Sequence, residues 1–119
     1  MGAPRFLRDF AAIVGVVNIN NVIRGAAQSG SLGYYACGQF QRRGYMTQGL
    51  ALVIEHAFAT LGLHRLEANI QPANARSKAL VRRLGFSPEG VSPRFLFIDG
   101  AWRDHERWAL IDERPSLYR

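Results

Sequence analysis

One segment has the residue types and the position to hold a phosphate group: Gln41-Arg42-Arg43-Gly44-Tyr45-Met46-Thr47. It follows a strand-like stretch and leads into a helical pattern. The first N–H groups of a helix lack partners within the helix, and the helix dipole is positive there, so a helix start binds anions. Gly44 allows close approach to the backbone, and Arg42 and Arg43 add positive charge. The same residues also fit an ordinary connection between a strand and a helix, with solvated arginines.

The elements that would position this segment follow from the spacing of apolar residues. From Met46 to Leu61 apolar residues recur at intervals of three and four, as on one helical face, and Gly62 is expected to end the helix. Residues 65–71 alternate between apolar and polar, as in a strand with one buried side. Asp99-Gly100 indicates a hairpin turn. We predict strands over 12–22, 31–37, 65–71, 94–98 and 101–111, helices over 46–61 and about 75–84, and loops over 24–30 and 38–44. This order predicts a single α/β (α+β) domain over residues 1–119, with a mixed sheet.

The composition narrows the class of protein and leaves its partner open. The 119 residues suffice for one globular domain, and 48% of them are hydrophobic. The net charge of +6, carried mainly by arginine, suits nucleic acid, anionic lipid or a phosphate-rich cofactor. Cys37 is the only cysteine, which excludes an internal disulfide, and no metal-ligand spacing is present, so we expect no metal. No run approaches the length of a membrane span, so we expect a cytoplasmic protein without a membrane partner.

Several further segments occur in a fixed order around the phosphate-binding candidate. They are Leu32-Gly33-Tyr34-Tyr35, His64-Arg65-Leu66-Glu67-Ala68, Pro72-Ala73-Asn74-Ala75-Arg76-Ser77, Leu84-Gly85-Phe86 with Glu89-Gly90, and Asp99-Gly100-Ala101-Trp102-Arg103-Asp104-His105. Together they resemble the GNAT superfamily of N-acetyltransferases over about residues 15–111. The nearest subgroup resembles the ribosomal-protein-alanine N-acetyltransferases of the RimJ and RimL type.

The resemblance implies a fold, a cosubstrate and a set of binding residues. The fold would be a mixed, mostly antiparallel sheet with helices packed on it. The cosubstrate would be acetyl-coenzyme A (acetyl-CoA), with its pyrophosphate on the 41–47 loop. By match, backbone groups of Tyr34, Tyr35 and Ala36 bind the pantetheine amides where two strands splay apart, and Asn74 hydrogen-bonds the pantetheine arm. A plain N-cap role for Asn74 is the alternative.

The sequence departs from the family pattern at three places. The family has a strand, two helices and another strand before the equivalent of residue 12, so we expect the usual first strand and two helices to be lacking. Met46 stands where the loop pattern has Gly or Ala. Val81 stands where many relatives have a tyrosine that protonates the leaving thiolate.

The catalytic candidates are Glu67 and Ser77. An amine must lose a proton to attack a thioester, and a carboxylate on the polar side of strand 65–71 can take it, directly or through water. Ser77 lies on the inner stripe of the second helix, one turn before Val81, and matches a serine proposed as the acid in RimL-like relatives. Glu67 could instead pair with Arg65 or another arginine, and the Ser77 hydroxyl could bond its own helix backbone.

The acceptor implied by the subgroup is the α-amine of a protein N-terminus. A small amine, such as an antibiotic or a polyamine, is the enzymatic alternative, and an inactive relative that only binds CoA is another. The arginines do not gather with aromatic residues in one stretch, which argues against a nucleic-acid-binding module. A sheet without its first strand would expose an edge, so we also expect a homodimer, with strand 12–22 near the contact.

Overall fold

In the computed structural model, which describes residues 15–36 and 45–114, the strands form one sheet in the order β1-β2-β3-β5-β4. The elements are β1 (Gly15–Ile23), β2 (Ser29–Ala36), α2 (Tyr45–Glu55), the π-helical turn η2 (His56–Thr60), β3 (Arg65–Ile70), α3 (Ala75–Arg83), β4 (Ser87–Ile98) and β5 (Ala101–Ile111). The pair β2–β3 is parallel, and the other described pairs are antiparallel. The predicted order of elements and the mixed, mostly antiparallel sheet are confirmed.

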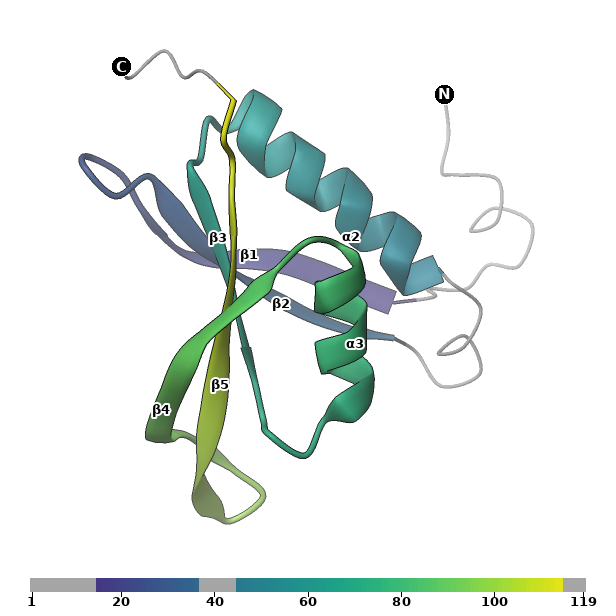
Figure 1. Ribbon diagram of the computed structural model, residues 1–119, viewed down its shortest axis with the longest axis vertical. Helices are drawn as coiled ribbons and strands as arrows, with labels where there is room; N and C mark the ends of the chain where they lie inside the picture. Colours follow the sequence, from purple (N-terminus) through teal and green to yellow (C-terminus); the bar gives the residue numbers. More distant parts are fainter. Residues whose placement is uncertain (1–14, 37–44, 115–119) are drawn as a thin grey trace.

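Both helices cover the same face of this sheet (Figure 1). In β3 the alternation is complete, with Leu66, Ala68 and Ile70 buried against the helices and the residues between them partly exposed on the other face. Leu50 of α2 and Val81 of α3 are fully buried in this core. The core is completed by the buried residues Leu32, Ala57, Leu63, Phe86 and Trp108. The opposite face of the sheet is therefore the one that carries the polar side chains.

Both helices end where the sequence predicts. Gly62 has φ of 71° and follows Leu61, the last residue of the 46–61 prediction. The last turn of this first helix, η2, is π-helical: the Leu61 N–H donates to the His56 carbonyl, five residues back, at 3.0 Å. Asn74 is the N-cap of α3, and Gly85, with φ of 100°, follows its end. The N-cap residue and the glycines that end the helices are signals within a few residues of each helix end, so the sequence predicts them.

Two predicted boundaries are wrong, and tertiary pairing explains both. The 24–30 loop is too long, because β2 begins at Ser29, where the Gln28 carbonyl accepts the N–H groups of His64 and Arg65 beside β3. The 94–98 strand is too short, because β4 begins at Ser87. Prolines in this segment interrupt the strand pattern of the sequence. In the structure Gly90 and Arg94 have positive φ, and β4 accommodates these residues with bulges because it is an edge strand. Residues 12–14 and 37 of the predicted strands lie outside the described residues.

Candidate active site

The parallel strands β2 and β3 pair for only part of their length. Their ladder joins Ser29 with Arg65, Gly30 with Leu66 and Ser31 with Glu67, and it stops there. Yet β2 continues to Ala36 and β3 to Ile70, and the two strands diverge (Figure 1). Backbone N–H and C=O groups that face this gap lack a strand partner, and such groups require one from elsewhere. The splay expected at this point of the sheet is therefore present.

A cleft of about 810 Å³ lies at this divergence, within the usual range for a small-molecule site. Its lining includes Tyr34 from β2, Glu67 and Asn69 from β3, and Ser77 from α3. The cleft thus brings together both catalytic candidates, Glu67 and Ser77, although they come from different elements. The other lining residues come from all five strands and from the β3–α3 connection: Asn20, Asn21, Ser31, Leu32, Gly33, Ala68, Ile70, Gln71, Asn74, Phe95, Leu96, Ile98 and His105.

The hydroxyl of Ser77 contacts the hydroxyl of Tyr34 in a short hydrogen bond. The alternative, in which this serine bonds its own helix backbone, is not what the described contacts show. Burial raises the pKa of Tyr34 above its ordinary value, and the bond to Ser77 partly opposes that shift. The phenol therefore stays protonated near neutral pH. Two hydroxyls, one from β2 and one from α3, thus meet in the cleft.

Asn74 serves as an N-cap in the structure. Its Oδ1 accepts the backbone N–H of Ser77 at 3.1 Å, which fixes the first turn of α3 and with it the position of Ser77. Asn74 also lines the cleft. The N-cap role of Asn74 is therefore observed; it is compatible with a contact to a pantetheine arm, and that contact stays a prediction.

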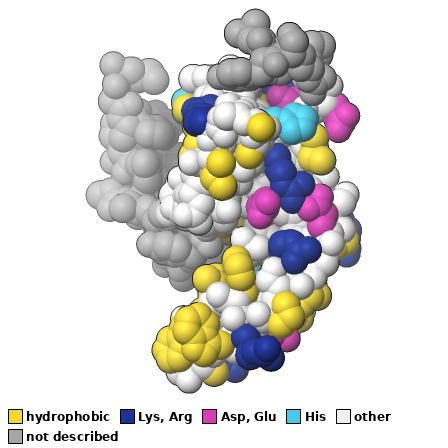
Figure 2. Space-filling view, turned by 90° about the vertical axis from the view of Figure 1, so that its left-hand side faces the viewer, with side chains coloured by type: hydrophobic (Ala, Val, Ile, Leu, Met, Phe, Trp, Pro, Cys, Tyr) yellow, Lys and Arg dark blue, Asp and Glu magenta, His cyan; other side chains and the backbone are white. Residues whose placement is uncertain are grey.

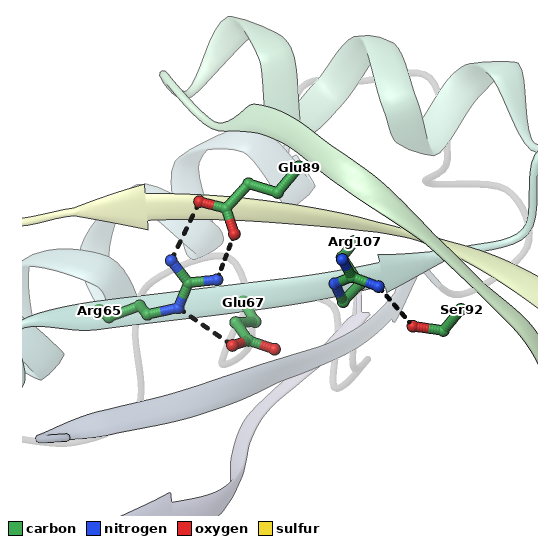
Figure 3. A network of polar contacts seen from close by, with 5 residues as sticks. All are labelled: Arg65, Glu67, Glu89, Ser92 and Arg107. Carbon is green, nitrogen blue, oxygen red and sulfur yellow. Dashed lines mark hydrogen bonds and ion pairs between the residues drawn. The ribbon is translucent and has the colours of Figure 1, made fainter.

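Glu67 is held by an ion pair on the polar face of β3. Its Oε2 accepts from Arg65 Nε at 3.0 Å, and the same guanidinium bonds Glu89 of β4 through two further nitrogens (Figure 3). The bond from Arg65 lowers the pKa of Glu89. The ion-pair alternative for Glu67 is thus realised, and it coexists with a place in the cleft, which Glu89 does not share. Arg65 positions the Glu67 carboxylate from one side.

The described residues include only the end of the predicted CoA loop. Gln41, Arg42, Arg43 and Gly44 lie outside the described residues, so their phosphate contacts stay predictions. The next three residues, Tyr45, Met46 and Thr47, form the first turn of α2, as the sequence predicts. Their backbone N–H groups are those that a helix leaves without internal partners. Tyr35 and Ala36 end β2 on the diverging side of the ladder, and binding of pantetheine by their backbone stays a prediction.

The structure adds cleft residues that the sequence did not single out. Asn69 of β3 shares the face of Glu67, which the alternation of the strand indicates without assigning it a role, and Gln71 follows the end of β3. His105 is 3% exposed, and its Nδ1 lies 3.0 Å from the Arg103 carbonyl. Phe95 of β4 packs edge-on against its ring. No local sequence signal predicts that β4, with Phe95, and β5, with His105, lie beside the cleft.

The polar face is visible in Figure 2, where basic and acidic side chains alternate along the middle and hydrophobic side chains gather at the lower end. That lower end is the β4–β5 hairpin, where four large apolar residues are at least 43% exposed: Phe95, Leu96, Phe97 and Trp102. Phe95 and Leu96 also line the cleft. Among residues 15–36 and 45–114, no group of metal-binding side chains is present. No helix in these ranges is long and apolar enough to cross a bilayer.

The described strands thus form a mixed sheet whose one parallel pair opens onto a cleft that holds the Glu67 carboxylate and the hydrogen-bonded hydroxyls of Tyr34 and Ser77. The Acetyltransferase (GNAT) domain family matches residues 5–87. The chain belongs to this GNAT acetyltransferase family, whose members use acetyl-CoA.

Three comparisons refine the relationship. The chain is 42% identical over 102 residues to the ribosomal protein uS5-alanine N-acetyltransferase of Escherichia coli, covering 86% of this chain and 53% of that protein. The ribosomal-protein-S5-alanine acetyltransferase structure from Vibrio fischeri has a TM-score of 0.86 at 31% identity, over 91% of this chain and 60% of that chain. The structure of Mycobacterium smegmatis RimJ in complex with CoA-disulfide has a TM-score of 0.83 at 38% identity, over 88% of this chain and 51% of that chain. The chain thus spans about half the length of the curated relative it matches here.

Proposed function

We propose that this chain transfers the acetyl group of acetyl-CoA to a primary amine, and that the preferred acceptor is the α-amine of a protein N-terminus beginning with alanine. The observation that carries the proposal is the interrupted β2–β3 ladder, which opens into a cleft containing Glu67 and Ser77. The acceptor class is supported by the relatives above, which are named ribosomal-protein-alanine acetyltransferases. A cytoplasmic location and a homodimer remain predictions of the same proposal.

Acetyl-CoA would bind along the unpaired edge of β2 and at the start of α2. Exposed backbone groups of Tyr34, Tyr35 and Ala36 would bind the pantetheine amides, in place of the missing strand partner. The start of α2, with the loop from Gln41 to Thr47, would bind the pyrophosphate. When bound, acetyl-CoA supplies the thioester whose acetyl group is transferred.

Glu67 and Ser77 would act as the base and the acid of the reaction. Glu67 takes one proton from the ammonium, directly or through water, which frees the nitrogen lone pair, and the proton that the nitrogen loses as the nitrogen–carbon bond forms passes to water. Ser77 donates its hydroxyl proton to the sulfur as the carbon–sulfur bond breaks, and Tyr34, hydrogen-bonded to it, replaces that proton and is itself reprotonated by water. Proton transfer by such placed groups typically accelerates a reaction by ~10²–10⁴-fold.

Calorimetric titration with acetyl-CoA tests cosubstrate binding. We expect saturable binding that competes with CoA, and loss of binding in Gly44→Val, because a side chain there would block approach of the pyrophosphate to the backbone. No heat and no thermal shift at millimolar ligand would refute the proposal.

Acetylation of a panel then tests the acceptor. The panel comprises alanine- and serine-starting peptides, spermidine and an aminoglycoside, and we expect the alanine peptide to react fastest. Fastest reaction of a small amine would establish the alternative acceptor class. Binding of acetyl-CoA without acetylation of any acceptor would identify the chain as a CoA-binding relative without transfer activity.

A further inference from the structure

Asn69 stands out in the cleft because its side-chain oxygen has no partner. Within the described residues, Asn69 Oδ1 is the buried side-chain polar atom that makes no hydrogen bond. Buried polar atoms are nearly always hydrogen-bonded, and an exception requires an explanation. Asn69 lies on β3 two residues after Glu67, on the same face, and both line the cleft. The residue with the unpartnered acceptor is thus about 7 Å from the proposed base along the strand backbone.

The neighbours of Asn69 are turned away from it. Arg107 lies directly opposite on β5 and is the nearest cation in register. Its Nη1 donates to Ser92 Oγ at 2.9 Å, so the guanidinium is directed toward β4 (Figure 3). It lies over Gly90, where an added Cβ would come within 2.7 Å of Nη2, so this glycine makes room for that orientation. On the other side, continuing the β2–β3 register would place Gly33 beside Asn69, and glycine has no side chain to donate.

An amide oxygen in this place calls for an N–H or O–H donor that arrives with a ligand. An amine acceptor carries such donors, and a carboxylate beside the amide oxygen favours a cationic or polar N–H group over a hydroxyl. When Glu67 removes one proton from a primary ammonium, two N–H groups remain. A hydrogen bond from one of them to Asn69 leaves the nitrogen lone pair as the group to be aimed at the thioester.

We propose that Asn69 binds the amino group of the acceptor, with its Oδ1 accepting one N–H beside Glu67, and so positions primary amines for acetyl transfer. This inference rests on the proposed function and assigns the acceptor subsite within it. Asn69 would touch the reacting nitrogen, whereas Arg107 would act only by leaving the oxygen available.

The test compares two variants with a control from the same cleft. Asn69→Leu keeps the size and removes the acceptor oxygen, Asn69→Asp keeps an oxygen, and Gln71→Leu changes a neighbouring cleft residue. With CoA saturating, each protein is titrated with an alanine-starting peptide and with its N-acetylated form, and steady-state KM values are measured for peptide and acetyl-CoA. A hydrogen bond to a charged group corresponds to about tenfold or more in affinity.

We expect the unsubstituted chain to bind the free-amine peptide more tightly than its acetylated form. Asn69→Leu should lose about tenfold of that preference, with acetyl-CoA binding unchanged. Asn69→Asp should restore the preference, and Gln71→Leu should retain it. The melting temperature of Asn69→Leu should not fall, because the oxygen makes no bond within the fold.

Three results would overturn the inference: equal binding of both peptides by the unsubstituted chain, an unchanged preference in Asn69→Leu, or equal losses in the Asn69 and Gln71 variants. Acetyl-CoA binding and acetyl transfer to the acceptor panel, both measured on the unsubstituted chain, decide the proposed function. The two failures can therefore be told apart.

Discussion

Strand β3 has two neighbours and pairs with them to very different extents. With β5 it forms a complete antiparallel ladder, from Arg65 opposite Ile111 to Ile70 opposite Glu106. With β2 the ladder ends after Glu67. The β5 side buries Trp108 opposite Ala68, whereas the β2 side opens into the cleft. One edge of β3 therefore stabilises the fold, whereas backbone groups on the other edge lack strand partners and face the cleft. Substitutions on the β5 side should mainly change stability, and substitutions on the β2 side should mainly change activity.

The largest effect is expected on the open side, at Glu67. Glu67→Gln should lower turnover by ~10²–10⁴-fold, because the amide cannot take a proton, with acetyl-CoA binding little changed. The measurements are kcat with an acceptor that the unsubstituted chain acetylates, and calorimetric titration with acetyl-CoA. Glu89→Gln is the matched control, because Glu89 shares Arg65 with Glu67 but does not line the cleft. Equal losses in both variants would show that only the ion-pair network matters.

On the paired side, Trp108→Ala should act on stability. The indole is 1% exposed, donates to Glu106 at 3.1 Å and lies under the Arg82 guanidinium. Removing such a buried ring typically costs about 3–5 kcal/mol in the free energy of unfolding. Urea denaturation measures it. Trp102→Ala provides the contrast, because Trp102 is 60% exposed and contacts Phe97 edge-on, so its loss should cost far less.

A smaller effect on activity is expected at the hydroxyl pair. Ser77→Ala should lower turnover by roughly tenfold, below the usual range for general acid catalysis, because water can also protonate a thiolate. Tyr34→Phe should lower it less. In the double variant the two losses should not add, because the hydroxyls act through one hydrogen bond. Additive losses, or full activity of Ser77→Ala, would contradict a shared role.

The smallest effect concerns pH and the ion pair between Arg65 and Glu89. The pKa of Glu89 is lowered in the folded protein, so its contribution to stability is present above the ordinary value of 4.5 and is lost as the pH falls through the folded value. Because the pair is partly exposed, the contribution should be at most about 1 kcal/mol. Unfolding free energies of the unsubstituted chain and Glu89→Gln, measured between pH 3 and 7, should converge at the acid end. A constant difference would mean that the charge of Glu89 does not matter.

Local sequence determined most of the elements. The stripe from Leu50 to Leu61 and the Asn74 N-cap of α3 are both present as the sequence predicts. The Asp99-Gly100 turn is also present, and both residues have positive φ. Each of these signals is an interaction between residues a few positions apart, so the spacing alone carries it. The β4 start at Ser87 was missed because its bulges depend on pairing with β5.

The site shows the limit of such local signals. From sequence, Glu67 and Ser77 could each be a catalytic group or a structural one, and both alternatives were open. Tertiary structure decided their surroundings, because Ser77 meets Tyr34 across 43 positions and Arg65 reaches Glu89 across 24. It also left Asn69 Oδ1 without a partner, since Arg107 turns toward Ser92. A side chain's hydrogen-bond partners depend on which strands and helices lie beside it in space, and spacing along the chain does not contain that information.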